Sequence, residues 1–376
     1  MRTRSKILFI CFIVLFQAGC WDAKEIGEVN YITTLGIDYK EENYIVYVQM
    51  LDFSSVSKQE TGKISQPTPL YIGKASGKNI NDAVYNLYRT SQQQVNWSHV
   101  GAIIYSDSVL KKGIQKVEES LIKHGDFRYT PWIFGTKESI EELLSATGFF
   151  QLPPVYTILY KPKDPYQLLS YIQPLRMYRF ISDYSEPGGT ALLPSISINE
   201  TVWKQSVDKP ETKKVLQING AFPVSNGKNK EWLSYEEISG IRWIQSQTQN
   251  TPVNILVDDV NKGTVRIKKP SAKIEVVRND RSFHFNITVD AKGTLLDLED
   301  PLSLEKIQEL VAKQIEKEIR NTYLKGIEKD ADVYNLKNLL FHDRVELEQI
   351  KNYQLTEESL NEITINFTLN SMGAYD

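Results

Sequence analysis

A single residue, Cys20, stands at a position that points to a defined chemistry. It follows the small residues Ala18 and Gly19, and ahead of them lies an unbroken apolar run, 7–16, behind a basic start. A basic start, an apolar stretch of about 7–15 residues and small residues before the cut define a secretory signal. A cysteine directly after the small residues is typical of a lipoprotein signal, in which the thiol is acylated and the amine becomes the new N-terminus. We therefore expect residues 1–19 to be removed and Cys20 to become an N-palmitoyl, S-diacylglycerol cysteine.

Gln17 departs from this pattern, because lipoprotein signals usually carry Leu three residues before the cysteine. Two alternatives stay open: an uncleaved N-terminal anchor, and an ordinary signal that is cleaved nearby. Both alternatives export the rest of the chain. About ten apolar residues are too few to cross a hydrocarbon layer of ~30 Å, which needs about 20. We therefore expect attachment to membrane lipid through the acyl chains of Cys20.

The two cysteines leave no disulfide in the mature protein, because Cys11 lies in the removed segment and Cys20 is consumed by lipid. Loss of Arg2, Arg4 and Lys6 leaves 41 basic residues against 47 acidic ones, a net charge of −6. A mildly acidic surface gives no support to nucleic-acid binding. The exported part of this 376-residue chain has no disulfide, so it has to be stabilised by the size of its core, over two or three domains.

The sequence offers no constellation of residues for catalysis, for a metal ion or for another cofactor. Its four histidines are scattered, and none is paired at i, i+4 around a glutamate: His99, His124, His284 and His342. No Gly-x-Ser-x-Gly elbow or Ser-x-x-Lys nucleophile stands between a strand and a helix. Adjacent carboxylates such as Glu41-Glu42 are more typical of solvated turns than of a glycosidase. We expect no catalytic residue and no cofactor.

Strand and helix patterns alternate through the first half of the chain. Apolar or alternating runs predict strands at 32–37, 44–51, 70–75, 100–105 and 131–136, the first two forming a hairpin. Helical spacing predicts helices that begin near residue 79 and that cover 109–124 and 138–146. The polar stretch 54–69 and the Pro- and Tyr-rich stretch 152–194 are expected to be loop or irregular.

The second half begins after a charged stretch and has a different pattern. Strands are predicted at 215–222, 283–289 and 363–369, with a weaker copy at 272–276. Ser234 and Glu237 have the spacing of a capping box. The apolar stripe of 303–325 predicts one long helix that ends at Lys325-Gly326.

These elements predict an α+β protein of several small mixed domains, mostly antiparallel sheets with packed helices. We expect an N-terminal region at 20–200 that holds one or two subdomains, a linker at 201–214, and a C-terminal domain at 215–376 made of an antiparallel sheet and one long helix.

Three stretches together resemble the C-subunit lipoproteins of spore nutrient germinant receptors, the GerAC family. The stretches are Gly19-Cys20-Trp21-Asp22 with Glu25-Ile26, then Asn96-Trp97-Ser98-His99-Val100, then Gly220-Ala221-Phe222 with Glu237, Gly240 and Trp243. The resemblance covers nearly the whole chain. Asn335 departs from it, because the family tends to have Gly after the aromatic residue at that point.

The resemblance implies a non-enzymatic subunit, anchored by lipid to the outer surface of the spore's inner membrane and needed for germination triggered by nutrients. Its implied partners are the integral membrane A and B subunits of the receptor. It also marks Trp21, Asp22, Glu25, Trp97, His99, Gly220 and Trp243 as recurring positions with a structural or interface role. The alternative is a solute-binding lipoprotein that captures a small nutrient, which the antiparallel pattern of the second half disfavours.

Overall fold

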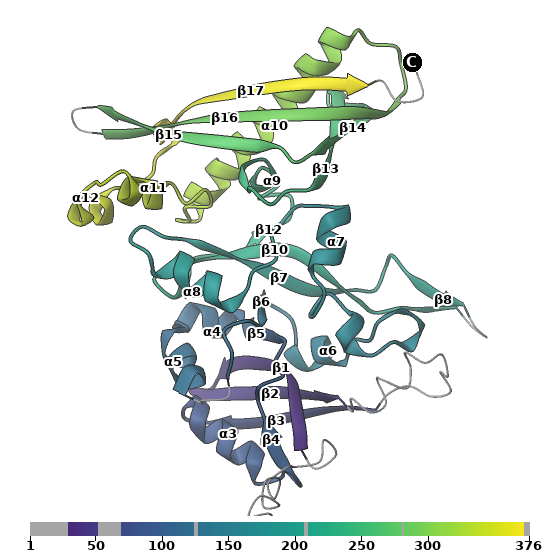
Figure 1. The fold of residues 1–376 in the computed structure, drawn as a ribbon, viewed down its shortest axis with the longest axis vertical. Coiled ribbons are helices and arrows are strands. Elements are labelled where there is room, and N and C mark those ends of the chain that lie inside the picture. Colours follow the sequence, from purple (N-terminus) through teal and green to yellow (C-terminus); the bar gives the residue numbers. More distant parts are fainter. Residues whose placement is uncertain (1–28, 52–68, 124–126, 207–209, 280–281, 372–376) are drawn as a thin grey trace, which may run out of the picture.

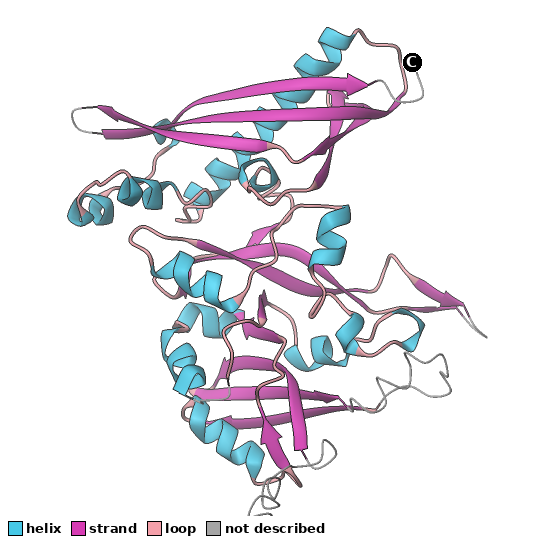
Figure 2. Ribbon diagram, in the orientation of Figure 1, coloured by secondary structure: helices cyan, strands magenta, loops and turns pink. Residues whose placement is uncertain are grey.

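Two large β-sheets, the first built from residues 29–234 and the second from residues 250–371, organise the fold (Figure 1). The computed structural model describes residues 29–51, 69–123, 127–206, 210–279 and 282–371. Helices lie against both sheets (Figure 2). The predicted signal peptide and nearly all of the predicted loop at 54–69 lie outside the described residues.

The first sheet has ten strands in the order β11-β10-β7-β6-β5-β1-β2-β3, with β4 beside β1 and β12 beside β10. The strands are β1 (Val29–Lys40), β2 (Asn43–Leu51), β3 (Leu70–Gly77), β4 (Gln94–Asn96), β5 (Ala102–Ser106), β6 (Trp132–Thr136), β7 (Ala191–Asn199), β10 (Val215–Ser225), β11 (Lys228–Asn229) and β12 (Leu233–Ser234). The pairings of β1 with β5, of β5 with β6 and of β6 with β7 are parallel, and so is that of β4 with β1. The remaining strands of the sheet pair antiparallel. β5 and β6 are buried along their whole length, as expected for parallel strands inside a covered sheet.

The predicted hairpin at the start of the described chain is confirmed. Lys40 of β1 pairs with Asn43 of β2. The two residues between them, Glu41 and Glu42, have φ values of 49° and 60°. Positive φ at both central residues is the type I′ geometry that matches the twist of a two-residue hairpin. The adjacent carboxylates therefore belong to a tight turn.

Two of the three helices predicted for the first half form as single helices, and the third prediction was wrong in extent. α3 (Ile80–Tyr88) is capped by the side chain of Asn79, and α6 (Ile140–Ser145) by that of Ser139. The single helix predicted at 109–124 is two helices, α4 (Asp107–Lys112) and α5 (Gln115–Lys123). Gly113 separates them with a φ of 110°, which no helix accommodates and which glycine adopts readily.

The stretch 152–194 is more regular than its composition predicts. It contains α7 (Lys163–Leu168), α8 (Met177–Ser185) and the start of β7. α8 buries Met177, Phe180 and Tyr184 at helical spacing. The aromatic residues of this stretch are therefore partly core, and the prediction of an irregular segment was wrong for α8.

Residues 201–214, predicted as an interdomain linker, connect two neighbouring strands of one sheet. β7 and β10 pair antiparallel, with Val215 opposite Asn199. The connection carries a short hairpin, β8 (Lys204–Ser206) with β9 (Pro210–Thr212). The first sheet thus continues through this stretch as far as β12.

The second sheet has five strands, in the order β13-β14-β16-β15 with β17 beside β16. They are β13 (Asn250–Val257), β14 (Val260–Lys268), β15 (Ser271–Asn279), β16 (Ser282–Leu298) and β17 (Leu360–Ser371). All pairs are antiparallel except β16 with β17, which is parallel. The expectation of an antiparallel strand at 363–369 was wrong in direction, because a helical crossover returns the chain to the same end of the sheet.

The long helix is confirmed and packs against this sheet. α10 (Leu304–Glu328) begins at the cap Ser303 and buries the predicted stripe from Ile307 to Tyr323. It continues three residues beyond Lys325, because Gly326 lies buried inside its last turn. Of the segment that follows the capping box, residues 235–240 are turn and only α9 (Ile241–Ile244) is helical.

The fold is therefore α+β, with antiparallel pairs outnumbering parallel ones, as the sequence predicts. α11 (Leu336–His342) and α12 (Leu347–Asn352) complete the crossover from α10 to β17. Among the described residues, no helix combines the length and apolar character that a membrane span requires.

A buried carboxyl group, Glu118 of α5, lies in the core of the first sheet. Glu118 is only 3% exposed, and one of its carboxylate oxygens accepts a hydrogen bond from the hydroxyl of Tyr184 on α8. Its other oxygen and the buried hydroxyl of Tyr105 have no hydrogen-bond partner among the described residues. Burial raises the pKa of Glu118 to about 7.

We expect Glu118 to make stability depend on pH. The folded chain holds its proton up to about pH 7, whereas the unfolded chain releases it near 4.5. The unfolding free energy should therefore fall as the pH rises through this window, by about 3 kcal/mol in all. Urea unfolding of the wild type and of Glu118→Gln at pH 4.5 to 7.5 tests this. Equal slopes in the two proteins would contradict it.

Candidate functional site

The residues that the sequence singles out fall into three groups in the structure. Cys20, Trp21, Asp22 and Glu25 lie outside the described residues, which begin at Val29. Trp97 and His99 lie at one end of the first sheet, and Gly220 and Trp243 lie where the two halves of the chain meet. The structure therefore does not gather the marked positions into one site.

Trp97 and His99 flank the entry to β5. Trp97 is 6% exposed, and its indole N–H donates to the hydroxyl of Tyr88 at 2.7 Å. The exposed ring of His99 stacks edge-on with Tyr31 at 4.6 Å between centroids, and its Nδ1 lies 3.0 Å from the hydroxyl of Ser98. Trp97 is thus part of the core, and His99 contacts β1 through Tyr31.

Gly220 allows a close approach of two strands. A Cβ atom at this position would lie 2.2 Å from the carbonyl oxygen of Leu233 and 2.9 Å from the ring of Trp232. Gly220 pairs with Ser234 of β12, next to a bulge in β10. The absence of a side chain therefore sets the path of the chain into the segment that follows.

That segment begins with the predicted capping box. The hydroxyl of Ser234 accepts from the N–H of Glu237, and the carboxylate of Glu237 accepts from the N–H of Ser234 at 2.8 Å. The same carboxylate binds the ammonium of Lys329 at 2.7 and 2.8 Å. Lys329 follows α10, so the capping box also fixes the segment to the end of the long helix.

Trp243 belongs to a buried ionic cluster. Its indole N–H donates to Glu318 of α10 at 2.7 Å, and Arg242 places a nitrogen 2.7 Å and 2.8 Å from the two oxygens of the same carboxylate. The side chains of Arg242 and Glu318 are 4% and 11% exposed. Arg242 also donates to the hydroxyl of Thr251 in β13 at 3.0 Å. The cluster ties α9, α10 and β13 together.

The cluster reaches into the first half of the chain. The guanidinium of Arg242 lies 4.5 Å from the ring centre of Tyr171, in the connection between α7 and α8. The ring of Tyr171 packs on Tyr235 at 4.0 Å between centroids. Sequence reasoning marked Trp243 and missed Arg242 and Glu318, because their pairing joins positions that are distant in the chain.

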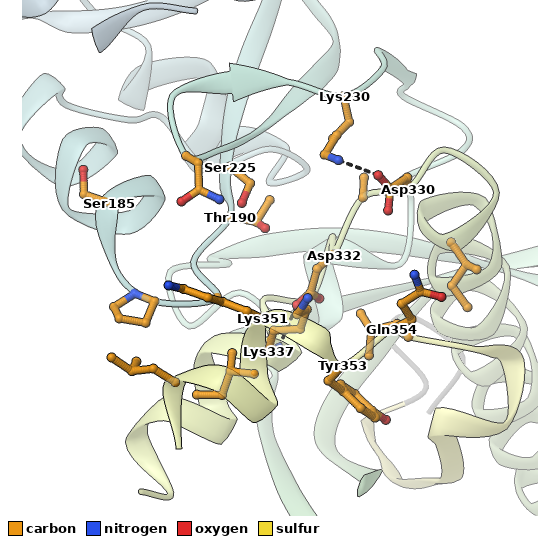
Figure 3. A pocket seen from close by; sticks show the side chains of 18 residues that line it. Ser185, Thr190, Ser225, Lys230, Asp330, Asp332, Lys337, Lys351, Tyr353 and Gln354 are labelled. Atoms are coloured by element: carbon orange, nitrogen blue, oxygen red, sulfur yellow. Dashed lines mark hydrogen bonds and ion pairs between the residues drawn. The ribbon is translucent and has the colours of Figure 1, made fainter. Parts of the chain in front are cut away.

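A cleft of about 710 Å³ opens between the part of the chain that carries the first sheet and the part that carries the second (Figure 3). One wall comes from the end of α8 and the turn between β10 and β11, and the other from the end of α10 and from α12. Lys230 and Asp330 form an ion pair at its rim. Lys337, Lys351 and Asp332 also line it, so the cleft presents charges of both signs.

Asn335 fixes the base of this region. It has a φ of 57°, the left-handed conformation that glycine adopts freely and asparagine tolerates. Its side-chain oxygen accepts from the N–H of Thr190 at 2.9 Å, across the two halves. Asp332 accepts from the N–H groups of Leu336 and Lys337, and burial raises its pKa to about 6. The departure from the family pattern at Asn335 thus keeps the backbone shape and adds a contact.

Within the described ranges, no group of three or more acidic, histidine or cysteine side chains is placed to hold a metal ion. His284 lies between Ser282 and the carbonyl of Glu358, at 3.0 and 2.9 Å. His342 lies 3.5 Å from the carboxylate of Glu186. These contacts give each of the two histidines a structural position.

Two family models match the chain and together span both sheets. Residues 22–198 match the N-terminal domain of spore germination proteins, and residues 219–373 match the spore germination B3/GerAC-like C-terminal domain. The chain belongs to the GerAC family of spore germination proteins. The stretch between the two matches, 199–218, carries the β8–β9 hairpin.

Curated members of the GerAC family from Bacillus subtilis (strain 168) are similar over most of their length. Spore germination protein B3 is 24% identical over 335 residues, 85% of this chain and 84% of that one. Spore germination protein KC is 22% identical over 331 residues, 83% of this chain and 81% of that one. The crystal structure of the GerBC protein shares the fold, with a TM-score of 0.55 at 15% identity over 89% of this chain and 96% of that one.

Proposed function

We propose that this GerAC-family protein is the lipid-anchored, non-enzymatic C-subunit of a spore nutrient germinant receptor. In this proposal it acts by assembly with integral membrane A and B subunits and is required for germination in response to nutrients. It lies on the exported side, at the outer surface of the spore's inner membrane, and is held there by acylated Cys20.

One observation carries the proposal: family matches that span both sheets follow directly on a Gly-Cys export signal. The buried positions support a docking role over a chemical one. Trp97, Gly220 and Trp243 serve packing, and Arg242 and Glu318 neutralise each other.

Replacing Cys20 by alanine removes the acylated thiol and tests the anchor. We expect the membrane-bound fraction of the protein to fall at least tenfold, because stable attachment takes more than one acyl chain and this variant has none. Nutrient-triggered germination of the spores should fall with it. Cys11→Ala, inside the removed segment, is the matched control and should change neither. Membrane association that persists in Cys20→Ala would count against lipid anchoring.

The cleft favours a second candidate, direct capture of a small nutrient by the exported chain. Its volume suits a small molecule, and its lysine and aspartate side chains suit one with charges of both signs. Calorimetry of the mature chain with amino acids and sugars distinguishes the two candidates, since tight binding by the isolated subunit would favour capture.

A further inference from the structure

An exposed aromatic patch is formed by residues that do not line the cleft. It consists of Phe149, Phe150, Val202 and Trp203, which are 42%, 86%, 68% and 53% exposed. The ring centres of Phe149 and Trp203 are 5.1 Å apart, and those of Phe149 and Phe150 are 6.5 Å apart. Soluble surfaces rarely gather large apolar side chains in this way unless they meet another surface.

The patch is built by two segments that are fixed to each other. The ammonium of Lys213 donates to the hydroxyl of Thr147 at 2.8 Å, and the N–H of Lys213 donates to the carbonyl of Trp203 at 2.9 Å. The hairpin of β8 projects beyond the body of the sheet, at the right of the view in Figure 1. The two segments that carry the aromatic side chains are therefore joined to each other within the fold.

The backbone at Phe150 is strained in a way that exposes its side chain. Its φ of 56° and ψ of 33° lie in the left-handed region, which a bulky aromatic residue avoids. A glycine or asparagine would adopt this turn at less cost. Strain and full exposure of one phenylalanine together point to a role for the side chain outside the fold.

The segment that leads to Phe149 is linked by hydrogen bonds to β1 and β2, the first strands of the described chain. The side-chain amide of Gln49 donates to the carbonyl of Leu144 at 2.7 Å, five residues before Phe149. The side-chain oxygen of Gln49 accepts from Thr34 of β1 at 3.2 Å. Cys20 precedes Val29 by nine residues, a reach of up to about 30 Å.

We propose that the aromatic patch inserts into the lipid interface of the membrane as a second contact beside the acylated N-terminus. This proposal rests on the proposed anchor at Cys20, which brings the body of the protein to the membrane. Exposed tryptophan and phenylalanine side chains suit the headgroup region, where aromatic rings concentrate. The exposed Lys204 stands next to Trp203 and suits anionic headgroups. Two contacts fix the orientation of the body, which a single contact leaves free to rotate.

The test uses the full mature chain, residues 20–376, with Cys20→Ser, so that no acyl chain contributes. Flotation with vesicles of phosphatidylglycerol and phosphatidylethanolamine measures partitioning of the wild-type patch and of Phe150→Ser/Trp203→Ser. Tyr71→Ser/Tyr85→Ser is the matched control, because both tyrosines are 63% exposed and lie on other elements. Phe150→Trp, which keeps an aromatic ring, guards against loss through misfolding.

A second readout places a fluorophore in the patch. The Cys20→Ser chain has no other cysteine, so Val202→Cys takes a single environment-sensitive label, and Tyr178→Cys, on α8, is the control site. We expect vesicles to shift the emission to the blue at 202 and not at 178. We expect the Phe150→Ser/Trp203→Ser chain to lose at least tenfold in partitioning, and the tyrosine control and Phe150→Trp to keep it.

Two results would overturn the proposal. One is a chain with the intact patch that stays in solution and shows no shift at 202, or a loss of partitioning in Tyr71→Ser/Tyr85→Ser as large as that in Phe150→Ser/Trp203→Ser. The other is a shift on native membranes but none on protein-free vesicles of the same lipids, which would assign the patch to a protein partner. Neither result bears on the anchor, because every arm lacks the acylated cysteine.

Discussion

Replacing Glu318 by alanine is expected to lower the free energy of unfolding by about 3–5 kcal/mol. The substitution leaves the guanidinium of Arg242 buried without its carboxylate and removes the acceptor of the Trp243 indole N–H. Breaking a buried ion pair costs this much because the remaining charge has lost its hydration and its partner. Urea unfolding followed by tryptophan fluorescence gives the measurement.

A double variant separates the loss of the ion pair itself from the cost of the charge that stays buried without a partner. Arg242→Met/Glu318→Leu removes both charges and fills a similar volume, so it should recover more than half of the lost stability. The exposed pair of Lys306 and Glu309 on the same helix is the control, and Lys306→Ala should cost less than about 1 kcal/mol. A Glu318→Ala protein within 1 kcal/mol of the wild type would show that the cluster does not stabilise the fold.

Local patterns predicted most of the elements of this fold. The stripe of α10 and the alternation in β16 are properties of consecutive residues, and both elements form as expected. The break at Gly113 and the direction of β17 depend on distant partners. Gly113 donates to Val109 and the next residue, Ile114, donates to the carbonyl of Gly227 in another turn. No local window of sequence contains that bond.

The site was predictable to a smaller extent. Cys20 stays a prediction, because it lies outside the described residues. Gly220 and Trp243 were marked by resemblance, and the structure supplies their physical reasons in Leu233 and Glu318. The cleft and the aromatic patch each combine segments far apart in the chain. No single segment has a sequence pattern that indicates a cleft or a patch, so neither feature was predicted.

Replacing Gly220 by alanine is the second large expected effect. The new Cβ would lie 2.2 Å from a backbone oxygen, so β10 and β12 have to separate. Overpacking of this kind costs about 3 kcal/mol. Gly148→Ala is the control, because its nearest neighbours lie 3.2 and 3.3 Å from the added atom, and it should cost less than about 1 kcal/mol. Urea unfolding measures both.

The backbone oxygen of Leu233, rather than the ring of Trp232, decides the cost of Gly220→Ala. Adding Trp232→Ala to the variant should therefore recover little stability, and a full recovery would assign the effect to the ring instead.

Movement of β12 also shifts Ser234 and the capping box, which lead directly to Arg242. Gly220→Ala and Glu318→Ala should consequently be non-additive by about 0.5–3 kcal/mol, as residues coupled through a shared backbone shift are. Additive losses would show that the strand contact and the ionic cluster stabilise the protein independently.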